Sequence, residues 1–197
     1  MAWVAPTFDN FNDVFAHLRD DPWRDKNVLV KPGVTGSELA AVEERFHFHF
    51  PPDLMEFLSI GLPSGGRFRD WRDGAEKELL DQLGWPVEGL LFDVRNNVFW
   101  LPAWGERPTD SGAAVAHARE CLHGIPSLIP IVGHRYLPSV PCEAGNSVLS
   151  VHQSDIVVYG DNLLEFLNND LGRRIPAIDE AKFAKARSVP FWGELVE

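Results

Sequence analysis

Apolar positions follow a helical period in the first third of the chain and form short alternating runs in the last third. In residues 7–19, phenylalanines and a leucine recur every three or four positions, which predicts an amphipathic helix with Thr7 as its N-cap. Residues 23–33 end in KNVLVKPG and indicate a loop or a short edge strand. We therefore expect residues 1–34 to form an N-terminal helical extension.

Residues 35–61 are predicted to form two helices separated by a Phe-Pro-Pro break. Thr35 or Ser37 is placed to cap a helix over 37–46. A second helix is expected over 52–60, because proline is tolerated in a first helical turn and glycine often ends a helix. Both helices should pack on a sheet through their apolar stripes, which consist of Leu39, Val42, Leu54, Phe57 and Leu58.

The middle of the chain contains the segment with the most distinctive composition, residues 84–104 (GWPVEGLLFDVRNNVFWLPAW). Two apolar runs flank Asn96-Asn97, and asparagine tolerates the positive φ that tight hairpin turns require. This pattern predicts a β-hairpin. Residues 76–83 and 112–123 suggest short helices, and residues 62–74 suggest a polar loop.

The last third has the pattern of a strand meander followed by a helix. The runs SLIPIVG, NSVLSVH and SDIVVYG are separated by Gly, Pro and Asn, and Asp161 is placed to cap a leucine-rich helix. Residues 173–197 are expected to add a charged helix, near 179–187, and a tail packed on the same domain. The order of elements predicts an α+β fold: a single domain over 35–172, with a mixed, mostly antiparallel sheet of about five or six strands from residues 85–160 and helices mainly on one face.

The charge of the chain restricts its partners. There are 18 basic and 29 acidic residues, for a net charge of −11. Binding to nucleic acid phosphates requires clustered Lys and Arg, so nucleic acid is not expected as a direct ligand. A basic protein partner is compatible with this charge, because opposite fields accelerate association. The sequence does not indicate an oligomeric state.

The sequence has no long apolar run and no basic start followed by an apolar region. We therefore expect no membrane association and a cytoplasmic location. The two cysteines, Cys121 and Cys142, are expected to be free thiols in a reducing compartment.

Candidate metal ligands occur without the spacing of a metal site. His47 and His49 alternate with phenylalanines, which favours an extended stretch with the phenylalanines inward and the histidines outward. No CxxC or HxxxH spacing occurs among the later ligand types, which are Cys121, His123, His134, Cys142 and His152. We expect no metal and no cofactor.

No local catalytic signature is present either. Asp70, Asp73 and Asp93 are the candidate acid–base carboxylates, but turn formation and loop solubility account for them. Gly65-Gly66 lacks the lysine of a phosphate loop. No catalytic residue is expected, and a small hydrolase that uses His134 or His152 with a carboxylate stays as an alternative.

Tryptophan and arginine are enriched where proteins bind one another. Trp71 lies between Arg69 and Arg72 in the polar loop, so its side chain is expected to be exposed, and Trp100 is expected to line a groove or the core. The predicted partner-binding residues are Arg69, Asp70, Trp71, Arg72, Asp73 and Trp100.

Four stretches between Thr35 and Gly172 resemble the SUKH superfamily, named for regulators of fungal cell-wall synthesis. They are SELAAVEERFHFHFPPDLMEFLSIG, GLLFDVRNNVFWLPAW, SLIPIVGHRYLP and SVHQSDIVVYGDNLLEFLNNDL. The resemblance implies a non-enzymatic α+β domain without catalytic residues. Many bacterial members are similar to immunity proteins that bind and neutralise a toxin, often a nuclease.

These observations lead to one expected function and one further alternative. The expected function is a non-enzymatic protein-binding module, an immunity protein that neutralises a toxin by direct binding. Its partner would be a basic toxin domain. The alternative, besides the hydrolase, is a standalone regulatory or housekeeping interaction protein without a toxin.

Overall fold

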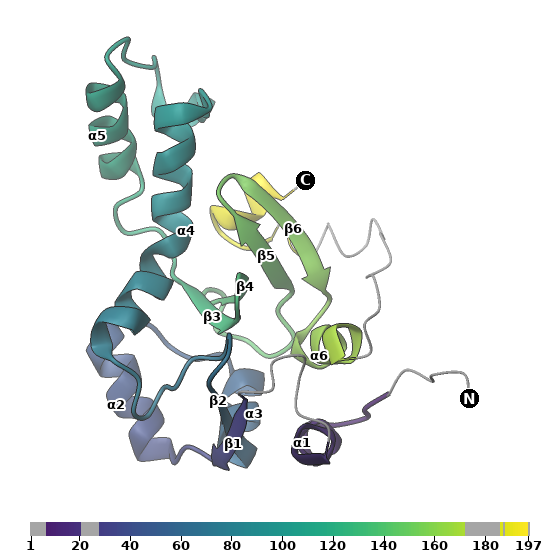
Figure 1. Ribbon diagram of the computed structural model, residues 1–197. Helices are drawn as coiled ribbons and strands as arrows, with labels where there is room; N and C mark the ends of the chain where they lie inside the picture. Colours follow the sequence, from purple (N-terminus) through teal and green to yellow (C-terminus); the bar gives the residue numbers. More distant parts are fainter. Residues whose placement is uncertain (1–6, 21–27, 172–185, 187, 197) are drawn as a thin grey trace.

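The computed structural model describes residues 7–20, 28–171, 186 and 188–196 (Figure 1). Its helices are α1 (Phe11–Asp20), α2 (Gly36–Phe46), α3 (Pro52–Ile60), α4 (Glu76–Asn96), α5 (Ser111–Cys121) and α6 (Leu163–Leu171). Two short 3-10 helices are η1 (Pro102–Trp104) and η2 (Trp192–Leu195). The predicted helix near 179–187 lies, except for residue 186, outside the described residues.

The strands form two antiparallel sheets. A two-stranded sheet pairs β1 (Leu29–Pro32) with β2 (Gly61–Ser64). A four-stranded meander runs in chain order through β3 (Leu128–Val132), β4 (Arg135–Pro138), β5 (Val148–His152) and β6 (Asp155–Gly160). The predicted α+β class is confirmed. In the described residues, however, the larger sheet has four antiparallel strands, not a mixed set of five or six, and it begins at Leu128 and not near residue 85.

The predicted β-hairpin over 84–104 is wrong. Residues 76–96 form the single long helix α4, and Val98 has a positive φ of 62° just beyond its end. The run GLLFDV fits a buried helix as well as a strand, because a short apolar run does not distinguish the two. Leu90, Leu91 and Val94 form the buried face of the helix.

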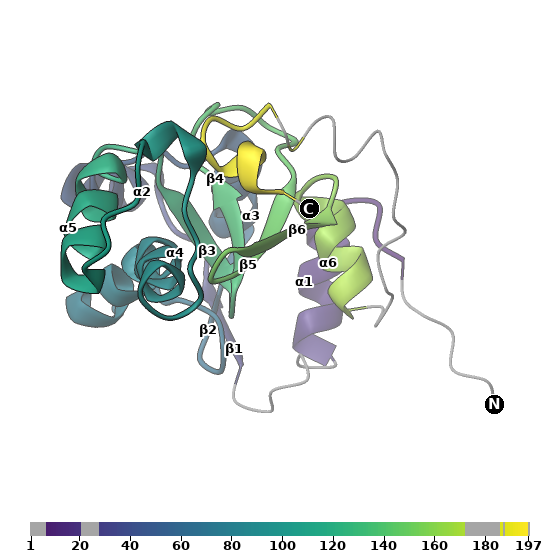
Figure 2. The same ribbon diagram turned by 90° about the horizontal axis from the view of Figure 1, so that it is seen from above.

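Helices cover both faces of the four-stranded sheet, not mainly one (Figure 2). Alternate strand residues point to opposite faces, so Ile129 and Leu137 belong to one core, and Leu128 and Tyr136 belong to the other. The first core includes α1, α2, α3 and α6, and the second includes α4, α5 and the C-terminal segment. The five predicted stripe residues of α2 and α3 are buried, as expected.

Local sequence signals set most of the helix starts. Thr35 forms a capping box with Glu38, and Pro52 occupies the first turn of α3. Two predicted caps are displaced. Helix α1 starts after Asn10, whose side chain accepts a hydrogen bond from the Asp13 N–H, and not after Thr7. Asn162, not Asp161, accepts the corresponding bond at α6, from the Glu165 N–H.

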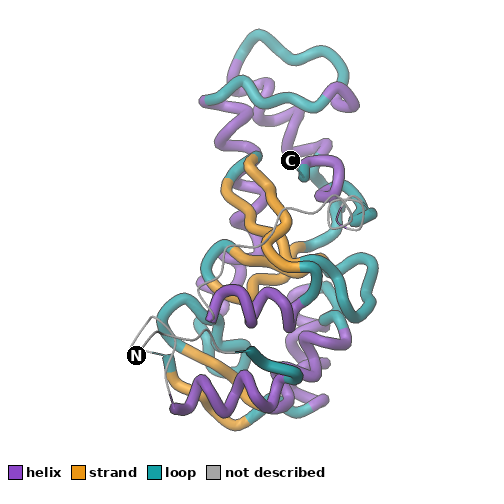
Figure 3. Tube along the Cα trace, turned by 90° about the vertical axis from the view of Figure 1, so that its right-hand side faces the viewer, coloured by secondary structure: helices purple, strands orange, loops and turns teal. Residues whose placement is uncertain are grey.

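The outer ends of α4 and α5 and the loop that joins them extend beyond the strands (Figure 3). The C-terminal segment packs against the meander on the same face. Trp192 is buried and donates a hydrogen bond from Nε1 to the Pro126 carbonyl at 2.7 Å. Val196 forms a parallel bridge with Ile156 of β6.

Candidate functional site

Helix α4 exposes two large aromatic side chains on one face. Trp85 and Phe92 are seven residues apart, which places them two turns apart on the same stripe, with Gly89 between them. Their residues are 52% and 49% exposed, whereas the opposite face of the helix is buried in the second core. Two half-exposed aromatics on a regular helix mark this stripe as the candidate binding surface.

A hollow of about 290 Å³ lies between the two aromatic rings and the β5–β6 turn. Glu88 and Gly89 of α4 line it, together with His152 and Gln153 of the turn. Gly89 brings helix and turn together, because a Cβ at this position would lie 2.9 Å from the Gln153 Cα. The hollow therefore depends on glycine at position 89.

Asp93, one helical turn beyond Gly89, connects α4 to the same β5–β6 turn. Its buried carboxylate accepts hydrogen bonds from the Ser154 N–H at 2.9 Å, the Ser154 hydroxyl at 2.6 Å and the Asn97 side-chain amide at 2.5 Å. Burial alone would raise the pKa of this carboxyl group, but these hydrogen bonds outweigh burial and lower it. Oδ2 of Asp93 thus accepts both hydrogen bonds from Ser154. Asp93 thereby keeps the β5–β6 turn, and with it the hollow, in place.

Pro86 lies inside α4 beside Trp85 and removes one helical hydrogen bond. The acceptor that loses its N–H donor is the carbonyl of Gln82, four residues earlier. The Tyr136 hydroxyl of β4 donates to this carbonyl at 3.3 Å. Burial raises the pKa of Tyr136 to about 12, so the hydroxyl keeps its proton at neutral pH. The sheet thereby compensates for the proline and fixes the helix next to Trp85.

A second hollow, of about 230 Å³, adjoins the first on the other side of Trp85. It shares Trp85 and His152 with the first hollow, and Arg69, Gln82, His134 and Tyr136 complete most of its wall. Both histidines of the hydrolase alternative thus lie in one pocket. No carboxylate, serine or cysteine lines it among the described residues.

The loop that the sequence predicts as the partner-binding site is anchored to the body of the protein. Trp71, expected to be exposed, is only 5% exposed. Its ring packs edge-on against Phe48 and Phe50, with centroids at 6.0 and 5.3 Å. Phe48 and Phe50 point inward and His47 and His49 outward as predicted, and Trp71 packs with these phenylalanines. The stretch is not extended throughout, because Phe46 ends α2 and His47 is a left-handed cap.

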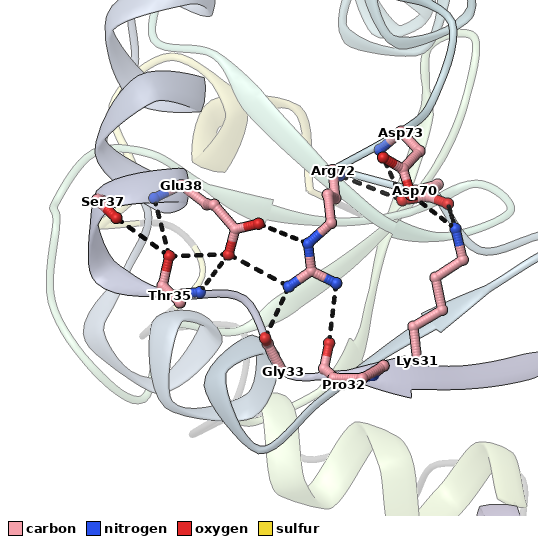
Figure 4. Close-up of polar contacts among 9 residues, drawn as sticks. All are labelled: Lys31, Pro32, Gly33, Thr35, Ser37, Glu38, Asp70, Arg72 and Asp73. Atoms are coloured by element: carbon pink, nitrogen blue, oxygen red, sulfur yellow. Dashed lines mark hydrogen bonds and ion pairs between the residues drawn. The ribbon is translucent and has the colours of Figure 1, made fainter.

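The charged neighbours of Trp71 pair with β1 and α2 (Figure 4). The Arg72 guanidinium donates to Glu38 at 2.6 Å and to the carbonyls of Pro32 and Gly33. Hydrogen bonds from Arg72, and then from Thr35, lower the pKa of Glu38 to about 2.

Lys31 forms the other half of this network. Its ammonium group lies 2.5 Å from Asp70 and 3.1 Å from Asp73. The charges that made the loop resemble an exposed binding segment therefore fasten it to β1.

Trp100 lies at the far end of α4, beside α5. Its ring stacks on His117 and meets Trp104 edge-on, with centroids at 5.6 and 5.2 Å, and its Nε1 donates to the Gly105 carbonyl. Of the six predicted binding residues, only Arg69 lines a pocket beside the α4 stripe. The predicted binding residues do not include Trp85, Gly89 or Phe92. A helical reading of positions 85, 89 and 92 would have identified the stripe.

Metal ligands do not converge in the described part of the chain, where no group of three or more His, Cys, Asp or Glu side chains could hold an ion. Both cysteines are free. Within the same residues, no helix has both the length and the apolar character needed to span a membrane.

Comparisons with known proteins add no relative. No family model matches the chain, and neither the curated proteins nor the solved structures gave a significant match.

Proposed function

We propose that the protein is a non-enzymatic protein-binding module that docks its partner on the α4 stripe of Trp85, Gly89 and Phe92. The observation that carries this proposal is the pair of half-exposed aromatic rings on either side of a preformed hollow. Exposed aromatics that flank a pocket are typical of interface hot spots. Gly89 and Asp93 hold helix and turn in place, so little order has to be gained on binding.

We further propose that the partner is a basic toxin domain and that the protein acts as its immunity protein. The support is the net charge of −11, which favours encounter with a basic protein, together with the resemblance of four sequence stretches to the SUKH superfamily, many of whose bacterial members are similar to immunity proteins. Occlusion by contact requires no catalytic group. The hydrolase alternative is less well supported, because none of the described carboxylates lines the pocket that contains His134 and His152.

Binding kinetics with the partner isolated from the native host test the docking surface. Trp85→Ala and Phe92→Ala should each speed dissociation about thirtyfold, which corresponds to about 2 kcal/mol for a hot-spot residue. Leu80→Ala is the matched control, because Leu80 is 51% exposed on the same helix but lies off the stripe. Rising salt should slow association for every variant, because it screens the field of the acidic surface. Unchanged dissociation of the folded double variant would refute the docking surface.

The immunity role has a separate test. The partner should arrest growth when it is expressed alone, and coexpression of the full chain should restore growth. Coexpression of the Trp85→Ala, Phe92→Ala double variant should restore it less well. A partner that binds on α4 but is harmless would refute the immunity role and favour the regulatory alternative.

A further inference from the structure

The second hollow beside Trp85 is lined by basic residues in an acidic protein. Arg69, His134 and His152 contribute side chains to its wall, and Arg67 lies next to it, 3.5 Å from the position of a Cβ on Gly133. These residues come from the loop before α4, from the β3–β4 turn and from the end of β5. Segments far apart in the sequence thus place four basic side chains around one small space.

Among the described residues, the arginines around this hollow form no ion pair, and Asp93 interacts with His152 only at longer range. The closest polar partner of Arg69 is the neutral amide oxygen of Gln82, at 3.0 Å, and Glu78 acts on Arg69 only at longer range. The Nε atom of Arg69 is buried without a hydrogen-bond acceptor, although the residue as a whole is only partly buried. A partly desolvated guanidinium without a counter-charge in contact favours an anion.

The titration of His134 is consistent with a positive local potential. Burial lowers the pKa of His134, and the charges of Arg135, His152 and Arg67 lower it further.

The walls of the second hollow are also fixed before any ligand arrives. Tyr136 is hydrogen-bonded to the Gln82 carbonyl, and the Gly133 N–H donates to the Arg67 carbonyl at 3.0 Å.

The neighbouring hollow indicates what the anion is attached to. The two spaces, of about 230 and 290 Å³, share Trp85 and His152, so one ligand can extend across both. Their combined size is in the range of small-molecule sites. The half-exposed indole of Trp85 offers a flat surface for ring stacking at the boundary between them.

We propose that the paired hollows on either side of Trp85 bind a small molecule in which a carboxylate or phosphate is attached to a planar ring. The anion lies against Arg69, His134 and His152, and the ring stacks on Trp85 toward Phe92. This site stands independently of the proposed protein partner. Because Trp85 belongs to both surfaces, a bound ligand would also occupy part of the proposed docking stripe.

Titration of the full chain with matched probes, followed by NMR and calorimetry, tests the proposal. Indole-3-acetate presents a ring with a carboxylate, and adenosine monophosphate presents a ring with a phosphate. Indole, acetate, adenosine and inorganic phosphate are the corresponding fragments. At least one ring–anion probe should bind tenfold or more tightly than either of its fragments, with chemical-shift changes at Trp85 and His134.

Two arginine variants test the cationic wall. Arg69→Gln should weaken binding of the better probe at least tenfold. Arg67→Gln, which changes an exposed side chain and leaves the fold intact, should weaken it severalfold. Arg45→Gln is the control, because Arg45 is an exposed arginine of α2 paired with Glu76 away from the pocket. The proposal is overturned if neither ring–anion probe binds better than its fragments, or if Arg67→Gln and Arg69→Gln both bind as the unmodified chain does.

Discussion

Gly89 lies where the backbone of helix α4 closely approaches the backbone of the β5–β6 turn. Glycine inside a helix is unfavourable by about 1 kcal/mol relative to alanine, so its presence requires a reason. The reason here is contact: a Cβ would approach the Gln153 backbone to 2.9 Å. Backbone atoms cannot move aside as a flexible side chain can, and the helix or the turn would have to shift.

Two glycines of the same helix therefore give opposite predictions. Gly89→Ala should lower the free energy of unfolding in urea, despite its better helix propensity. Gly84→Ala, which has open space around its Cβ position, should raise it by about 0.5–1 kcal/mol. Stabilisation by both substitutions would contradict the close contact between helix and turn.

Asp93 should make the stability of the protein depend on pH. Its folded pKa is lowered, so its contribution is fully present above the unfolded pKa of about 3.9 and is lost as the pH falls through the folded value. At pH 7, Asp93→Asn should reduce the free energy of unfolding by about 2 kcal/mol, because it weakens charge-assisted hydrogen bonds to Ser154 and Asn97.

The difference between Asp93→Asn and the unmodified chain should shrink as the pH falls from 5 toward the folded pKa. Urea unfolding curves at several pH values measure it. Asp81→Asn is the control, because Asp81 forms an exposed pair with Lys77 on the same helix. A difference that stays constant with pH would show that the charge of Asp93 is not what holds the turn.

Among the elements, those governed by local signals are the ones that the sequence predicts correctly. Helices α2 and α3 start where a capping box and a proline place them, and these signals act within three residues. The meander of β3 to β6 also follows from alternating apolar runs and turn residues. In each case the residues that determine the element lie within it.

Long-range contacts contribute to the two main errors. Proline is unfavourable inside a helix, but Tyr136, 50 positions beyond Pro86, supplies a donor for the carbonyl that the proline leaves unpaired. Trp71 looks exposed because charges surround it, but those charges pair with Lys31 and Glu38. A pattern read along the chain contains neither contact. The error at Trp71 is therefore a consequence of tertiary structure, whereas the hairpin error also reflects an apolar run that fits a helix as well as a strand.

At the scale of the whole molecule, α4 connects the two cores. Leu79 near its start belongs to the first core, and Leu90 and Val94 belong to the second. The exposed stripe therefore lies on the element that is held from both sides of the molecule. Such a position suits a binding surface, because a rigid surface loses little conformational entropy when a partner docks.

The net charge is also a property of the whole molecule. The net charge of −11 produces a field that reaches beyond contact distance and favours approach of a basic protein. The basic residues around the second hollow are a local exception to this acidic character. The long-range field would thus govern encounter, and the aromatic stripe would govern how long the complex lasts.

Site-specific photo-crosslinking in the native host tests the central claim, that α4 carries the binding surface. A photo-reactive amino acid replaces Trp85 or Phe92 in the full chain, and replaces Leu80 or Trp100 as controls. We predict that positions 85 and 92 crosslink to the same protein and that position 80, off the stripe, and position 100, at the far end of the helix, do not. A partner captured from position 80 or 100 but not from 85 or 92 would contradict the account.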